Sequence, residues 1–107
     1  MGSKREEQVS QMIAHLAGDF LARESNRQSL MTVTRADVSP NFKHVTIFVS
    51  VLPENLEESA LAFAKRERSA FRDYVKKHSK LHPIPTVDFE IDYGEKNRQR
   101  IDDLTRE

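Results

Sequence analysis

The chain has 107 residues, of which 37% are hydrophobic, so its length and composition allow one compact domain with one core. Its 17 Lys and Arg residues balance 17 Asp and Glu residues, so the net charge of zero does not by itself indicate a nucleic-acid partner. It has no cysteine, which excludes disulfides and thiolate sites, and no apolar run of the roughly 18 residues that a membrane span needs, so we expect a cytoplasmic protein.

The first predicted element is an amphipathic helix. Ser3 and Glu6 have the spacing of a capping box, at which a helix begins. Apolar residues then recur at helical intervals, at Val9, Met12, Ile13, Leu16, Phe20 and Leu21. The polar stretch 24–29 offers no apolar face and predicts a connection.

Two strands are predicted next. Met31 to Val38 is rich in β-branched residues, and its side chains alternate between two sets: Thr32, Thr34, Ala36 and Val38 against Val33, Arg35 and Asp37. Residues 39–41 form a Ser-Pro-Asn turn. From His44 to Leu52 the apolar residues fall on one face: Val45, Ile47, Val49 and Val51. We expect the two strands to pair as a hairpin.

A long helical pattern follows and has one flaw. Asn55 and Glu58 repeat the spacing of a helix cap, and the pattern reaches about His78. Its apolar positions are Leu56, Ala60, Phe63, Ala64, Phe71, Tyr74 and Val75. Glu67 lies in the middle of this apolar row, where a straight helix would bury its charge. We therefore expect a bend at Glu67 that lets the carboxylate reach water.

The last predicted strand completes the fold. Pro83 and Pro85 exclude a helix, and apolar residues then alternate with acidic ones: Val87, Phe89 and Ile91 against Asp88, Glu90 and Asp92. The order αββααβ predicts an α+β fold with the helices packed on one face of a three-stranded sheet, as in a type II KH-like domain. Residues 1–94 would form this domain, and residues 95–107 a charged tail in which a short helix is an option.

The charges are distributed unevenly. Between residues 65 and 80, seven cations stand against two carboxylates, Glu67 and Asp73, so this segment carries a net charge of +5. The cations are Lys65, Arg66, Arg68, Arg72, Lys76, Lys77 and Lys80. The rest of the chain therefore carries −5, and the molecule should be electrically polarised.

The hairpin region reads TVTRADVSPNFKHVTIFVS over residues 32–50 and resembles the signature segment of the ribosome-binding factor A family. The resemblance extends over about residues 4 to 104. It includes Lys4, Arg5 and Val9, the pair Phe71-Arg72, and the run Leu81-His82-Pro83-Ile84-Pro85 before Val87-Asp88-Phe89 and Asp92. It implies a KH-type cytoplasmic assembly factor that binds the free 30S small ribosomal subunit and 16S rRNA during late maturation and rRNA processing, especially in the cold.

The chain departs from the family at the bend of the paired helices. The family bends there at an Ala-x-Gly sequence, whereas positions 67–69 of this chain are Glu, Arg and Ser. The Gly-x-x-Gly loop with which KH domains clamp a nucleic-acid backbone is also missing, because glycine occurs only at Gly2, Gly18 and Gly94. The angle of the bend, and with it the RNA-facing surface, is therefore left open by the sequence.

The candidate RNA contacts are cations on the long helix. Lys65, Arg68, Arg72 and Lys76 follow one another at intervals of three and four residues, which places them on one helical face. Arg66, Lys77 and Lys80 widen this row, and Arg35 and Lys43 are further candidates near the hairpin turn. Such a row can follow a phosphate backbone. The alternative is an ordinary solvated face, and Arg35 could instead pair with a carboxylate.

Three other sequence patterns are weaker candidates for functional sites. His78 and His82 have a spacing that zinc sites use, but Pro83 breaks the helix beside them, so no metal is expected. Asp88, Glu90 and Asp92 predict a solvent-exposed sheet face, and Phe48 is a weak candidate for base stacking.

No nucleophile, general base or cofactor motif is evident, so we expect a monomeric binding protein and not an enzyme. The alternative function is a protein-interaction module that meets ribosomal or other proteins without direct RNA contact.

Overall fold

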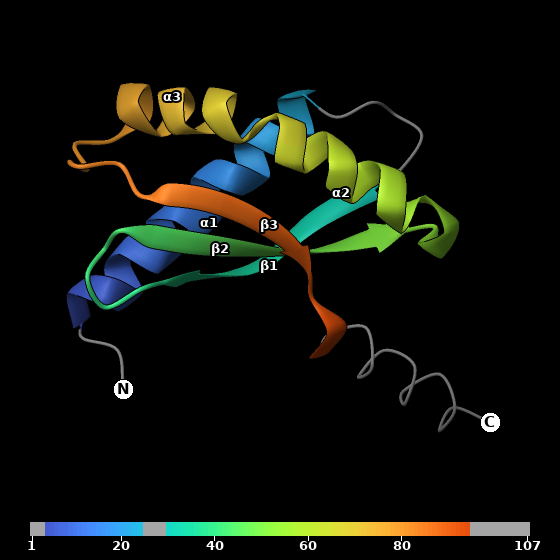
Figure 1. Ribbon diagram of the computed structural model, residues 1–107, viewed down its shortest axis with the longest axis horizontal. Coiled ribbons are helices and arrows are strands. Elements are labelled where there is room, and N and C mark those ends of the chain that lie inside the picture. The colour runs from blue at the N-terminus through green and yellow to red at the C-terminus, as the bar shows by residue number, and fades with distance from the viewer. Residues whose placement is uncertain (1–3, 25–29, 95–107) are drawn as a thin grey trace.

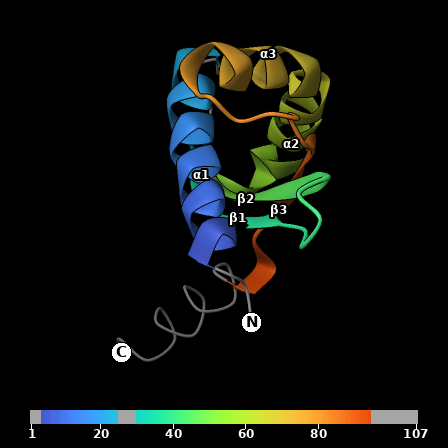
Figure 2. The ribbon, with the colours of Figure 1, turned by 90° about the vertical axis from the view of Figure 1, so that its left-hand side faces the viewer.

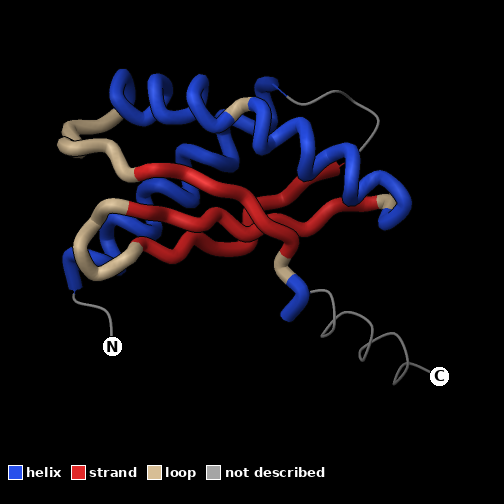
Figure 3. Tube along the Cα trace, in the orientation of Figure 1, coloured by secondary structure: helices blue, strands red, loops and turns tan. Residues whose placement is uncertain are grey.

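In the computed structural model, which describes residues 4–24 and 30–94, three strands form one sheet in the order β1-β2-β3. Strand β1 (Leu30–Val38) runs antiparallel to β2 (His44–Leu52), and β2 runs parallel to β3 (Thr86–Ile91). The helices cover one face of this sheet (Figures 1 and 3). The α+β fold and the order αββααβ predicted from the sequence are therefore confirmed. The predicted tail, residues 95–107, lies outside the described residues, as does the predicted cap at Ser3.

Helix α1 (Lys4–Glu24) packs along β1 and buries one stripe of its surface. The buried residues are Val9, Ile13, Leu16, Ala17, Phe20 and Leu21, which follow the helical intervals of an amphipathic helix. Figure 2 shows α1 on one side of the molecule, α2 on the other and α3 running between them. Among the helices of the described segments, none combines the length and the apolar character that crossing a bilayer requires.

Strand β1 contains a bulge that the sequence pattern did not show. Thr34 is the extra residue, because Val33 pairs with Val49 while Arg35 already pairs with Phe48. The core-facing positions consequently change parity: they are Met31 and Val33 before the bulge and Ala36 and Val38 after it. The single alternation predicted for residues 31–38 is therefore wrong at Thr34, whereas the predicted apolar face of β2 is confirmed by four buried side chains.

The long helical pattern is divided in two, as predicted. Helix α2 (Glu57–Arg66) ends at Glu67, whose backbone leaves the helical conformation at φ −91° and ψ 7°, and α3 (Arg68–His78) begins directly after it. The carboxylate of Glu67 is thereby half-exposed and does not enter the core. The predicted cap at Asn55 is wrong, because a short 3-10 turn, η1 (Glu54–Leu56), precedes α2 and no side chain caps the helix.

The core joins the helices to the sheet through aromatic side chains. Phe71 of α3 is fully buried, and its ring lies 5.4 Å from that of Phe20 and 6.1 Å from that of Phe89. These three rings come from α1, α3 and β3, and aromatic pairs at such separations stabilise a fold beyond the area that they bury. Contacts with both α1 and β3 therefore fix the position of α3 over the sheet.

Candidate nucleic-acid interface

The break at Glu67 brings the cations of α2 and α3 to the side of the helices that faces β3. Lys65 lies in the last turn of α2 and Arg68 is the first residue of α3, and the Nε of Arg68 donates a hydrogen bond of 2.9 Å to the carbonyl of Lys65. Arg72 and Lys76 follow at one-turn intervals. We call Lys65, Arg68, Arg72 and Lys76 the cationic edge. The row predicted from the sequence is thus assembled, but across a break and not on one straight helix.

Asp88 of β3 accepts hydrogen bonds from two of these cations. Its Oδ1 lies 2.9 Å from the Nζ of Lys65 and 3.4 Å from an Nη of Arg68, and it also accepts the backbone N–H of Phe89 at 2.9 Å. Partial burial alone would raise the pKa of the Asp88 carboxyl. The hydrogen bonds and the charges of Lys65 and Arg68 outweigh this effect and hold the pKa below its usual value of 3.8. One carboxylate therefore offsets part of the positive charge at the α2 end of the cationic edge.

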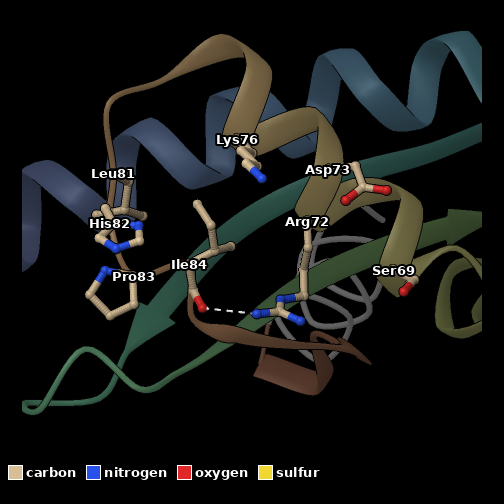
Figure 4. A pocket seen from close by; sticks show the side chains of 8 residues that line it. All are labelled: Ser69, Arg72, Asp73, Lys76, Leu81, His82, Pro83 and Ile84. Atoms are coloured by element: carbon tan, nitrogen blue, oxygen red, sulfur yellow. Dashed lines mark hydrogen bonds between the residues drawn. The ribbon is translucent and has the colours of Figure 1, made fainter.

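Arg72 is held by the backbone of the segment that leads into β3. Its Nε donates to the carbonyl of Pro85 and its Nη2 to the carbonyl of Ile84, each at 3.1 Å. Figure 4 marks the bond to Ile84. These acceptors are neutral, so Arg72 keeps its full charge while its guanidinium plane is fixed. The pair of bonds also fastens the segment 81–85 to α3.

Between α3 and this segment lies an open groove of about 390 Å³. Its wall on α3 is formed by Ser69, Arg72, Asp73 and Lys76, and its wall on the connecting segment by Leu81, His82, Pro83 and Ile84. Figure 4 shows the side chains of Lys76 and Arg72 extending from α3 toward the segment that carries the second group. Arg72 and Lys76 lie on one face of α3, as their spacing predicted, whereas no sequence pattern indicated the groove.

The other predicted cations are arranged in two ways. Arg66, Lys77 and Lys80 are exposed close to the cationic edge. Lys43 is also exposed, and its carbonyl accepts the N–H of Thr86 at 2.8 Å, which places it beside the start of β3 and so near the segment that binds Arg72. Arg66, Lys77 and Lys80 thus add positive charge near the ends of α2 and α3, and Lys43 adds it beside the start of β3.

Arg35 lies apart from the other candidates, on the outer face of the sheet. Its guanidinium stands 3.9 Å from the centre of the Phe48 ring, and its Nη1 lies 2.5 Å from a carboxylate oxygen of Asp37. Its Nε is also 3.7 Å from Asp92. The structure therefore favours the alternative that Arg35 pairs with carboxylates, and the face of Phe48 that a base could stack on is covered by Arg35.

The three acidic residues around β3 do not form the wet carboxylate face that the sequence suggested. Asp88 reaches α2 and α3, as described above, whereas Asp92 is buried, with 7% of its surface exposed, and accepts a hydrogen bond of 2.5 Å from the hydroxyl of Thr34. Glu90 alone of the three is exposed. In the described part of the chain, no group of three or more His, Asp or Glu side chains is arranged to hold a metal ion.

A family model for ribosome-binding factor A matches residues 5–105. The chain belongs to the ribosome-binding factor A family. Ribosome-binding factor A of Natranaerobius thermophilus is 26% identical over 110 aligned positions, which cover 100% of this chain and 84% of that protein. The protein of the same name from a Bradyrhizobium strain is also 26% identical, over 98% of this chain and 80% of its own length.

Solved structures of the ribosome-binding factor A family share the fold. The crystal structure of ribosome-binding factor A from Thermus thermophilus superposes with a TM-score of 0.73 at 15% identity, covering 80% of this chain and 94% of that one. The solution structure of a Thermotoga maritima protein assigned to ribosome binding factor A gives a TM-score of 0.68 at 22% identity, over 84% and 89% of the two chains. At these identities the likeness shows the fold alone.

Proposed function

We propose that this protein binds the free 30S small ribosomal subunit and contacts its 16S rRNA through the cationic edge, during late maturation and rRNA processing. Two findings support this. The chain belongs to the ribosome-binding factor A family. A homology model of Thermus thermophilus ribosome binding factor A, which gives a TM-score of 0.67 and covers 76% of this chain, has been fitted into the cryo-EM map of a complex between the 30S subunit and that factor.

The observation that carries the proposal is the fixed position of Arg72 among exposed lysines. Phosphate oxygens are bound most strongly by cationic donors, and a guanidinium that is already held in place loses little freedom when it binds. Around Arg72, the side chains of Lys76, Lys77 and Lys80 are exposed. The α3 end of the cationic edge therefore offers a polyanion several cations, while Asp88 reduces the charge at the α2 end.

The test is co-sedimentation with isolated small subunits. A variant with Lys76, Lys77 and Lys80 all changed to Gln should bind weakly, and the slope of log affinity against log salt should become shallower by about 2, at roughly 0.7 per lost phosphate contact. The control changes three exposed cations of α1 instead, Lys4, Arg5 and Arg23, and removes the same charge. Equal loss in both variants would show that only net charge matters and would contradict the proposal.

Nuclease treatment separates this function from the alternative. In our proposal the protein acts as a cytoplasmic monomer that binds RNA and catalyses no reaction, so digestion of the RNA should release it from subunit particles. If the protein remained bound to ribosomal proteins after complete digestion, a protein-interaction module without direct RNA contact would replace our proposal.

A further inference from the structure

The groove between α3 and the segment 81–84 is built unlike an ordinary solvated surface. Leu81, Pro83 and Ile84 supply an apolar wall, and the opposite wall on α3 is polar. Its volume of about 390 Å³ lies at the small end of the range of ligand sites. Because two hydrogen bonds from Arg72 hold Ile84 and Pro85 against α3, the two walls are fixed relative to each other before any ligand arrives.

Three polar side chains on the α3 wall of the groove are available to a ligand. In the part of the chain that the structure describes, the side chains of Ser69, Asp73 and Lys76 make no hydrogen bond or ion pair, although all three are exposed in the groove. These residues lie at intervals of four and three along α3, so their side chains share one face over two turns, about 10 Å. The carboxylate of Asp73 thus lies on the Ser69 side of Lys76, with Arg72 beside it.

We propose that this groove binds one unpaired guanine nucleotide of the RNA, an inference that rests on the proposed function. The phosphate lies against Lys76 and the remaining N–H groups of Arg72, which supply the positive charge. The base packs its flat, apolar face against Pro83 and Ile84. Its hydrogen-bonding edge meets Asp73, with the hydroxyl of Ser69 as a second partner.

The preference for guanine follows from the chemistry of a carboxylate. The two oxygens of the Asp73 carboxylate accept hydrogen bonds and do not donate them. Guanine presents two N–H donors side by side, which fit the two carboxylate oxygens, whereas the single N–H of uracil is flanked by two carbonyls that the carboxylate repels. Adenine and cytosine each offer one amino group beside an acceptor, so we expect them to bind less tightly than guanine and more tightly than uracil. The groove would therefore add selectivity for the base, whereas the other cations recognise only the phosphate backbone.

The test uses the full-length protein with two probes, a short oligouridine and the same oligomer with one central guanine. We expect the guanine oligomer to bind at least about fivefold more tightly, the discrimination typical of a paired base contact. In NMR spectra, addition of the guanine oligomer should shift the amide signals of residues 69–76, Leu81, His82 and Ile84 more than addition of the oligouridine does. Asp73→Asn should abolish the preference, because an amide no longer presents two acceptors.

A matched pair of variants separates the groove from general charge. Lys76→Gln and Lys77→Gln remove the same charge from neighbouring positions on α3, but only Lys76 lines the groove. We expect Lys76→Gln to weaken binding of the guanine oligomer several times more than Lys77→Gln does. Equal binding of the two oligomers by the parent protein, or equal effects of the two variants, would overturn the inference.

The subunit assay keeps the two proposals apart. If the parent protein binds small subunits but shows no base preference, the groove is refuted and the proposed function remains. Guanine preference without any affinity for small subunits would refute the proposed function and leave the groove as an RNA-binding site.

Discussion

Removing the charge of Asp88 should change stability and RNA binding in opposite directions. Asp88→Asn keeps an oxygen that can accept the N–H of Phe89 but ends both ion pairs, with Lys65 at 2.9 Å and Arg68 at 3.4 Å. The side chains of the Lys65 pair are 38% and 46% exposed, so solvent screens both interactions. Discounted for that exposure, the two pairs contribute about 1 kcal/mol together, and the midpoint of thermal unfolding should fall by about 4–8 °C.

The same substitution should strengthen RNA binding, because it frees two cations of the cationic edge. The net charge rises by one, and Lys65 and Arg68 become available to phosphates. If both bind, the slope of log affinity against log salt steepens by up to about 1.4. Filter binding with a single-stranded RNA over a range of salt concentrations measures this slope, and Glu90→Gln is the matched control, since it makes the same charge change at an exposed position of β3.

Acid should remove the difference in stability between the two proteins. Because the pKa of Asp88 is lowered in the folded state, its contribution is present above the ordinary value of 3.8 and is lost as the pH falls through the lower folded pKa. The unfolding free energies of the parent and Asp88→Asn proteins should therefore converge at low pH. An Asp88→Asn protein as stable as its parent at neutral pH, with the salt slope unchanged, would refute this reasoning.

Three further substitutions test the fold and the anchoring of Arg72. Phe71→Ala should lower the unfolding free energy in urea by about 3–5 kcal/mol, because it empties a fully buried site; a loss under about 1 kcal/mol would show that the aromatic core is not needed. Thr34→Val should cost about 1–3 kcal/mol in the same assay, since the buried carboxylate of Asp92 loses a donor, whereas an unchanged midpoint would contradict this. Arg72→Lys keeps the charge but cannot hold both carbonyls, so amide exchange at Leu81, His82 and Ile84 should accelerate and subunit binding should weaken. Unaltered exchange would disprove the anchoring role.

The order of elements could be predicted because local signals agreed with it. The apolar face of β2 and the helical intervals of α1 are properties of the sequence alone, and tertiary packing did not alter them. The break at Glu67 was also predictable, because a straight helix would bury the charge of Glu67 within its apolar row. The bulge at Thr34 was not, because its hydroxyl is held by the carbonyl of Phe48 and by Asp92, both distant in the sequence.

The cationic edge was predictable as a set of residues but not as an arrangement of charge. Helical spacing placed Arg72 and Lys76 together, and that spacing would also have placed Ser69 and Asp73 on the same face. No local signal showed that Asp88 would form ion pairs with Lys65 and Arg68. Nor did one show that Arg72 would donate hydrogen bonds to the carbonyls of Ile84 and Pro85. Such partners depend on how β3 lies against the helices, which only the assembled fold determines.

Crosslinking of the protein to isolated small subunits, followed by mass spectrometry of the peptides that carry RNA, tests the central claim most directly. Our account predicts RNA attached to peptides from residues 65–84, which contain the cationic edge and the groove. RNA attached only to α1 or to the outer face of the sheet around Arg35 and Phe48 would contradict it.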